Sequence, residues 1–333
     1  MSLEAEQNIG RLEKVAGISL PVREQLILRK MHLEPLDAAE NSGKRISLVT
    51  GIHGDELEGQ LVAYLVNRRI REHPEHLRGT VDIYPAMNPL GINTIERGIP
   101  GFDLDMNRTF PGDAEGAMTE YYVNQAFEDI KGSDFAIDLH ASNIFLRELP
   151  QVRISEETQD SLLPYAGLLN LDFIWIHSAA TVLQSTLAYS LNHAGTRCLV
   201  VEMGVGMRLT QAYAAQVTEG IFHLMHSEGM WNGETGLTHA PVTCRDEVEF
   251  LNANAAGIFI PSVEHDMHVR KGERIGVIAD PLTGTDRETI QAPEDGLLFT
   301  LREYPVVYPG SLLGRIYVPG EAQKSEGNGG EAK

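Results

Sequence analysis

Short apolar runs alternate with helical patterns along roughly the first 230 residues. Residues 55–73 place Leu57, Leu61, Tyr64 and Leu65 on one helical stripe, and residues 119–132 and 209–229 are also typical of helices. Strands alternating with helices predict an α/β fold with a mixed sheet. Several runs are apolar enough for strands buried on both faces. The predicted strands are QLILRKMHL (25–33), RISLVTG (45–51), TVDIYPAMNP (80–89), FAIDLH (135–140), LDFIWIH (171–177) and CLVVEMG (198–204).

The pattern changes after about residue 235, where short strands and turns replace helices. Two segments there repeat each other weakly, starting at Gly257 and Gly296. Each opens with glycine and a short strand, and later has a glycine followed six residues on by isoleucine. Two related hairpin units predict a small pseudo-symmetric β sandwich. We therefore expect an α/β domain at residues 1–238, which carries the candidate chemistry described below, a β domain at 239–319 and a disordered polar tail at 320–333.

Composition excludes some classes of function. The 333 residues are 42% hydrophobic and 22% charged, which is ordinary for a soluble globular protein. The formal charge of −20 argues against a nucleic-acid partner, because phosphate binding needs a basic patch. No run reaches the roughly 18 to 20 apolar residues of a membrane span, and the N-terminal segment lacks a signal-peptide pattern. With only Cys198 and Cys244, we expect no structural disulfide and a cytoplasmic location.

Candidate chemistry begins in GIHGDELEG, residues 51–59. His53 and Glu56 follow a strand at the start of a helix, and imidazole and carboxylate both suit zinc. Alone the signal is weak, because the helix dipole also favours acids such as Asp55, Glu56 and Glu58 at this position. His140 and Glu202 likewise follow apolar runs. Ligands bind at the carboxyl ends of strands in such sheets, so these strand ends together predict a metal site with an open position and a nearby general base.

Four motifs in this order resemble the succinylglutamate desuccinylase/aspartoacylase family of the zinc carboxypeptidase superfamily. They are GIHGDELEG (51–59), DLDMNRTFPG (103–112), DLH (138–140) and VEMG (201–204), and the resemblance covers roughly residues 45–230. It implies a mixed-sheet zinc-carboxypeptidase-like domain followed by a smaller C-terminal all-β, barrel-sandwich-like domain. It also implies cleavage of the amide between an acyl group and an amino acid. The C-terminal segment suggests the branch that includes N-acetyl-diaminobutyrate deacetylases.

The resemblance also implies roles for particular residues. The metal ligands fall on His53, Glu56 and His140, holding one zinc ion per chain, and the general base on Glu202. Asn107 and Arg108 hold the substrate carboxylate, which suits a planar guanidinium. Asp105 orients the first histidine ligand, and Arg97 polarises the scissile carbonyl. A family tyrosine near the C-terminus matches Tyr304 or Tyr308, for which core packing is the alternative role.

The remaining candidates have simpler interpretations. The pairs His73/His76, His223/His226 and His265/His268 suit turns or helix ends better than a functional metal site, whereas His177 ends an apolar run and is a candidate to line the pocket. The C-terminal segment also resembles a biotinyl or lipoyl carrier, but the stretch between its half repeats, residues 278–296, contains no lysine. We expect no carrier function there, and a lid or assembly surface instead.

The function that follows is a zinc-dependent amidohydrolase acting on a small N-acyl amino acid. A zinc carboxypeptidase acting on a peptide C-terminus is the alternative with the same chemistry, and a metal-free binding protein is the alternative of a different class. The expected partner is a small-molecule N-acyl amino acid, with no nucleic acid and no membrane, and a homo-oligomer is an expected assembly.

Overall fold

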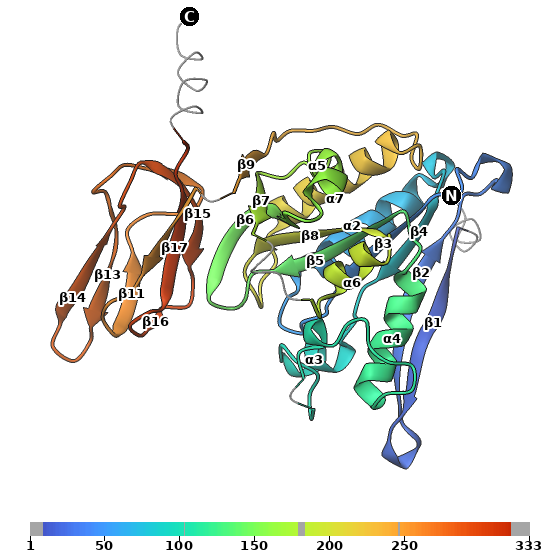
Figure 1. Ribbon diagram of the computed structural model, residues 1–333, viewed down its shortest axis with the longest axis horizontal. Helices are drawn as coiled ribbons and strands as arrows, with labels where there is room; N and C mark the ends of the chain where they lie inside the picture. The colour runs from blue at the N-terminus through green and yellow to red at the C-terminus, as the bar shows by residue number, and fades with distance from the viewer. Residues whose placement is uncertain (1–8, 103, 179–183, 246, 321–333) are drawn as a thin grey trace, which may run out of the picture.

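A single large mixed sheet runs through most of the molecule, and helices cover both of its faces (Figure 1). The structure is a computed structural model that describes residues 9–102, 104–178, 184–245 and 247–320. The helices of the described residues are α2 (Glu58–Glu72), α3 (Pro89–Thr94), α4 (Met118–Ile130), α5 (Gln159–Ala166), α6 (Leu187–His193) and α7 (Gln211–Ser227).

The large sheet has the order β1-β2-β4-β3-β5-β8-β6-β15-β17-β10, with β7, β9 and β12 paired beside this path. Its strands from the first part of the chain are β1 (Gly10–Ser19), β2 (Gln25–Leu33), β3 (Arg45–Thr50), β4 (Thr80–Tyr84), β5 (Phe135–Ala141), β6 (Leu146–Ser155), β7 (Phe173–His177), β8 (Arg197–Gly204) and β9 (Val242–Cys244). The central strands β4, β3, β5 and β8 are parallel, whereas β6 runs antiparallel to β8. The predicted mixed-sheet α/β fold is confirmed.

Each face of the sheet carries its own apolar core, because side chains alternate between the faces along a strand. On one face, Ile137 and Leu139 of β5 and Leu199 and Val201 of β8 pack in the same core as α2, α5 and α7. On the other face, Ala136 and Cys198 pack with α4 and α6. By the same alternation, Asp138, His140 and Glu202 belong to the face of α4 and α6.

Two sequence-based predictions of local structure were wrong or incomplete. Of the predicted stripe, Leu61 and Leu65 are partly buried against the core but Tyr64 is 55% exposed. The fully buried side chains of α2 instead include Val62, Val66 and Ile70. Because α2 packs against both the sheet and α7, its apolar face lies one position away from the stripe that the leucines suggested. The strands β1 and β6 were not predicted. Polar residues interrupt β1, and Pro150 lies inside β6.

The described residues of the C-terminal segment form strands joined by turns, and its predicted internal repeat has a structural counterpart. Its strands are β10 (Val248–Asn252), β11 (Gly257–Pro261), β12 (Met267–Val269), β13 (Arg274–Asp280), β14 (Thr285–Gln291), β15 (Gly296–Arg302), β16 (Val306–Val307) and β17 (Leu312–Tyr317). Within the halves, β11 pairs with β13 and β15 pairs with β17. Between the halves, Gly257 pairs with Val307, and Gly296 pairs with Val269. The two halves therefore exchange their short strands in the same way.

The C-terminal strands stand at one end of the molecule and β1–β2 at the other (Figure 1). The strands β14, β13, β11 and β16 form a separate antiparallel sheet, whereas β15 pairs with β6 and so extends the large sheet. The boundary near residue 238 stays a prediction, and the predicted disordered tail lies outside the described residues except for its first position. Both cysteines are buried. No helix among the described residues is long and apolar enough to cross a membrane.

Candidate active site

His53 and Glu56 lie in the turn between β3 and α2. Both are buried, with 3% and 4% of their surfaces exposed. Gly54 makes this turn possible, since a Cβ there would clash with the backbone of Gly91. The Nδ1 atom of His53 lies 2.7 Å from Oε1 of Glu56. The turn therefore brings the two predicted ligands of GIHGDELEG together.

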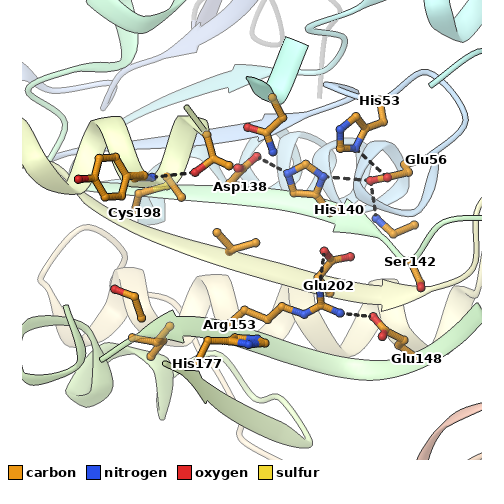
Figure 2. A pocket seen from close by; sticks show the side chains of 18 of the residues that line it. His53, Glu56, Asp138, His140, Ser142, Glu148, Arg153, His177, Cys198 and Glu202 are labelled. Atoms are coloured by element: carbon orange, nitrogen blue, oxygen red, sulfur yellow. Dashed lines mark hydrogen bonds and ion pairs between the residues drawn. The ribbon is translucent and has the colours of Figure 1, made fainter. Parts of the chain in front are cut away.

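His140 completes a three-residue group at the end of β5. Its Nδ1 atom lies 3.0 Å from Oε2 of Glu56, and the two imidazole rings are 5.1 Å apart. The ligating atoms of His53, Glu56 and His140 all lie within 4.8 Å of one another. Figure 2 shows both rings turned toward the Glu56 carboxylate. Two imidazoles and one carboxylate are a ligand set of catalytic zinc sites.

The electrostatics of this group suit a cation. Burial alone would lower the pKa of both imidazoles, yet neighbouring carboxylates raise the pKa of His53 and of His140 above the ordinary value. The same histidines hold the pKa of the buried Glu56 carboxyl well below its usual range. The Nδ1 atom of His53 is buried, and its 2.7 Å contact with Glu56 is an ion-pair contact without hydrogen-bond geometry. A metal ion would take the place of the protons on these rings, so the residues present fit a divalent metal.

A second carboxylate stands behind each imidazole. Nε2 of His53 lies 3.1 Å from Oδ1 of Asp105, and Nε2 of His140 lies 3.1 Å from Oδ1 of Asp138. Such partners fix the tautomer and orientation of metal-ligating histidines. The contact of Asp105 is the one that the sequence resemblance implies. Asp138 was not predicted, although a residue two positions before His140 on a strand must share its face.

The other acids of the motif have separate positions. Glu58 is fully buried and accepts hydrogen bonds from the backbone N–H and the hydroxyl of Thr210, both at 2.7 Å. It therefore ties the start of α2 to the segment before α7. Burial raises the pKa of the Asp55 carboxyl, and the nearby Glu56 adds to this. Of the three acids near the helix start, only Glu56 belongs to the ligand group.

Glu202 lies on β8, directly opposite His140 on β5. Burial raises the pKa of its carboxyl to about 7, although the Arg153 guanidinium and His140 act against this. Nη1 of Arg153 lies 3.3 Å from Oε1 of Glu202. A carboxyl with a pKa near neutrality, beside this group of potential metal ligands, has the properties of a general base.

The predicted substrate-binding residues line the same cavity. Asn107 accepts a hydrogen bond from the backbone N–H of Leu187 with its amide oxygen at 2.9 Å, so its NH₂ group is the one available to a carboxylate. Arg108 is exposed beside it and donates to the Asn107 carbonyl. Nη1 of Arg97 lies 3.0 Å from Oε1 of Glu56, and its Nε lies 3.3 Å from Oδ2 of Asp105. Arg97 therefore contacts the ligand group directly.

The cavity has a volume of about 540 Å³ and also contains residues that sequence reasoning missed. Arg153 and Glu148 of β6 and Arg315 of β17 lie in its wall (Figure 2 labels Arg153 and Glu148). His177 lines it too, and burial together with Arg153 and Arg315 lowers the pKa of this imidazole to about 4. It is therefore neutral at physiological pH.

Other candidates lie outside the cavity. Tyr304 and Tyr308 do not line it. They are 44% and 67% exposed, so the alternative prediction that they pack in the core was wrong. Both lie in or near the turns that precede β17, where the Tyr304 ring packs edge-on against Phe145 and Tyr308 is mostly exposed. His73, Glu75 and His76 form a second group of potential ligands, but it is largely exposed on the surface.

Comparison with known proteins identifies relatives of this chain. The chain is 26% identical over 283 residues to N-alpha-acetyl-L-2,4-diaminobutyric acid deacetylase from Halomonas elongata. The aligned region covers 79% of this chain and 78% of that protein. Two solved structures share the fold. A succinylglutamate desuccinylase/aspartoacylase from Rhodobacter sphaeroides has a TM-score of 0.76 and 21% identity, covering 93% of this chain and 96% of that one. The product-bound ectoine utilization protein EutE (DoeB) from Ruegeria pomeroyi has a TM-score of 0.77 and 19% identity, covering 94% and 96%.

The family model for the succinylglutamate desuccinylase/aspartoacylase catalytic domain matches residues 42–227, which include the ligand group, Asn107, Arg108 and Glu202. More than half of the chain is matched, and the chain belongs to the succinylglutamate desuccinylase/aspartoacylase family.

Proposed function

We propose that this protein is a zinc-dependent hydrolase that cleaves the amide bond of a small N-acyl amino acid. The observation that carries the proposal is the buried His53–Glu56–His140 group, with Glu202 and Arg108 in the wall of the same cavity. The relative from Halomonas elongata is named as a deacetylase of an N-acetylated amino acid, which supports an acylated amino acid as the substrate. Zinc held by the three ligands would supply a Lewis acid for the scissile carbonyl and for water.

The chain's own residues perform the remaining steps. Asn107 and Arg108 bind the substrate carboxylate and so fix the amide relative to the ligand group. Glu202, when ionised, takes a proton from the attacking water and passes it to the leaving nitrogen. We assign Arg97 the stabilisation of negative charge on the carbonyl oxygen, since it lines the cavity next to Glu56 of the ligand group. Asp105 and Asp138 keep the imidazoles oriented throughout.

The proposal has a direct test in substrate screening. N-acetyl, N-succinyl and N-formyl amino acids, with N-alpha-acetyl-2,4-diaminobutyrate among them, should be offered to the metal-loaded protein and the release of free amino acid measured. Release from one or more of these supports the deacylase. Release of C-terminal residues from peptides alone would indicate the carboxypeptidase, and a full-length protein that holds no metal would indicate the metal-free binding protein.

The anchoring role of Arg108 gives a separate prediction. A substrate whose carboxylate is amidated should be hydrolysed poorly by the parent enzyme, since it cannot pair with the guanidinium. Arg108→Lys keeps the charge but loses the planar fork, so we expect KM for the acid to rise by about tenfold or more. Steady-state kinetics on the acid and the amide measure both effects. Equal turnover of acid and amide by the parent enzyme would remove Arg108 from this role.

Location and partners follow the same reasoning. We propose a cytoplasmic protein, because the chain has only two cysteines and Cys198 is a buried free thiol, a state that a reducing compartment maintains. The partner that we propose is a small N-acyl amino acid rather than a nucleic acid, since the chain carries a formal charge of −20. A homo-oligomer remains a proposal that sedimentation or light scattering of the full chain tests.

A further inference from the structure

Four charged side chains form a continuous row from the candidate general base to the C-terminal β segment. Arg153 contacts Glu202 through Nη1 at 3.3 Å and Glu148 through Nη2 at 2.7 Å. Arg315 then donates from Nη1 to the other oxygen of Glu148. Figure 2 shows the Arg153 guanidinium between the two carboxylates. The row therefore joins residues of β8, β6 and β17, and all four line the cavity.

The strand order places these residues side by side. β6 lies between β8 and β15, and β15 lies between β6 and β17. Glu148 pairs with Thr300 of β15, and Thr300 pairs with Arg315 of β17. The Thr300 hydroxyl donates to Glu148 at 3.5 Å and lies 3.4 Å from Nη1 of Arg315. The extension of the large sheet by the C-terminal strands is thus what brings Arg315 to the active-site wall.

Burial makes this arrangement sensitive to the loss of any member. The Glu148 side chain is 1% exposed, and those of Arg315 and Glu202 are each 15% exposed. Buried ion pairs are a weak source of stability, because desolvation offsets much of the attraction, but removing one partner leaves a buried charge unpaired. The row ends on the carboxylate that the proposed reaction uses, so its geometry bears on catalysis.

The contacts of Arg153 link Arg315 to Glu202, which Arg315 does not contact itself. Glu148 has two guanidinium partners, Arg153 and Arg315, and Arg153 is shared between Glu148 and Glu202. Without Arg315, Arg153 would be the remaining ion-pair partner of Glu148. Arg153 is already closer to Glu148, at 2.7 Å, than to Glu202, at 3.3 Å. Arg153 would move toward Glu148, and Glu202 would lose its only described ion-pair partner.

We propose that Arg315 is a positioning residue for the hydrolysis, holding the Glu202 carboxylate in place through Glu148 and Arg153. The C-terminal β segment therefore completes the active site from its last strand, although it brings no ligand to the metal group. This inference rests on the proposed function, because it assigns the row a role in the proton transfer by Glu202.

The test compares Arg315→Gln with Arg287→Gln in the full-length, metal-loaded protein. Arg287 belongs to the same segment and pairs with Asp280 at 2.6 Å, but it lies outside the cavity. Arg315→Gln should keep its metal and lose about 10- to 100-fold in kcat, with KM changed much less, since misplacement of a catalytic group lowers the rate of the chemical step. Arg315→Lys should recover most of the loss, because a single nitrogen makes the contact with Glu148. Arg287→Gln should match the parent.

A second variant keeps the test valid if Arg315→Gln does not fold. Glu148→Gln breaks the same row and should also lower kcat, and the double variant should lose no more than the larger single loss, because the row is already broken. Normal kcat in Arg315→Gln or in Glu148→Gln overturns the proposal. So does a change in KM alone, which would make Arg315 a substrate contact.

Failure of the proposed function would have a different signature. A parent protein that hydrolyses no N-acyl amino acid contradicts the function and gives no rates to compare. Crystal structures of the parent and of Arg315→Gln then decide the inference. A longer Arg153–Glu202 separation in the variant supports it, and an unchanged separation overturns it.

Discussion

Glu202→Gln is expected to hold the metal normally and to lose about 10²- to 10⁴-fold in kcat, the usual contribution of a general base. The amide has nearly the shape of the carboxylate, so packing against β5 and β6 is kept. It cannot accept the proton of the attacking water or pass it to the leaving nitrogen, so the substitution removes both proton transfers assigned to Glu202. Steady-state kinetics together with metal content per chain measure the two effects separately.

The control for this variant is Gln151→Ala, which changes a neighbouring buried side chain of β6 but touches no ion pair of the described residues. Gln151 pairs with Glu202 across β6 and β8 and is fully buried, but it does not line the cavity. Its loss is expected to lower stability more than kcat. A Glu202→Gln enzyme with kcat close to the parent value would show that another group takes the proton.

The raised pKa of Glu202 predicts how the rate depends on pH. Burial raises this pKa to about 7, so the carboxyl binds a proton more readily than an exposed one does. The base form is therefore lost as the pH falls, and kcat/KM should decline on the acid side with an apparent pKa at or below about 7, because a bound cation nearby favours the ionised form. A pH–rate profile measures this, and a rate that is flat down to pH 5 would contradict the assignment.

The sequence predicted the ligand group because each of its members lies in a short motif that can be recognised from the neighbouring residues. His53 and Glu56 share one turn, and His140 and Glu202 each follow a recognisable apolar run. Parallel strands whose carboxyl ends meet at one sheet edge then bring distant segments together without further information. The positions of β3, β5 and β8 as neighbours satisfy that condition.

The sequence did not predict the charged row, for two physical reasons. Glu148 and Arg153 lie on β6, which runs antiparallel and contains Pro150, so neither its apolar pattern nor its composition identified a strand. Arg315 lies 167 residues from Glu148 along the chain, and only the pairing of β15 with β6 brings them together. Treating the C-terminal segment as a separate domain concealed that pairing.

A graded loss of metal is expected along the series His177→Ala, Asp138→Asn and His140→Ala. All three positions line the same cavity, so the series separates ligation from general damage to the pocket. His177 is not part of the ligand group, so the His177→Ala protein should keep about one metal per chain. Asp138→Asn leaves the imidazole in place but removes its buried carboxylate partner, which typically costs about 10- to 100-fold in metal affinity.

His140→Ala removes a ligand outright and should cost more than the loss of its partner, abolishing measurable hydrolysis with it. It also leaves the Asp138 carboxylate, 1% exposed, without its imidazole, so thermal unfolding must show that the variant is folded. His53→Ala, on the other side of Glu56, provides a second ligand variant with the same expected result. Metal content after dialysis against a chelator orders the series. Full retention by the folded His140→Ala and His53→Ala proteins, or equal loss in His177→Ala, would show that the metal is not held by these ligands.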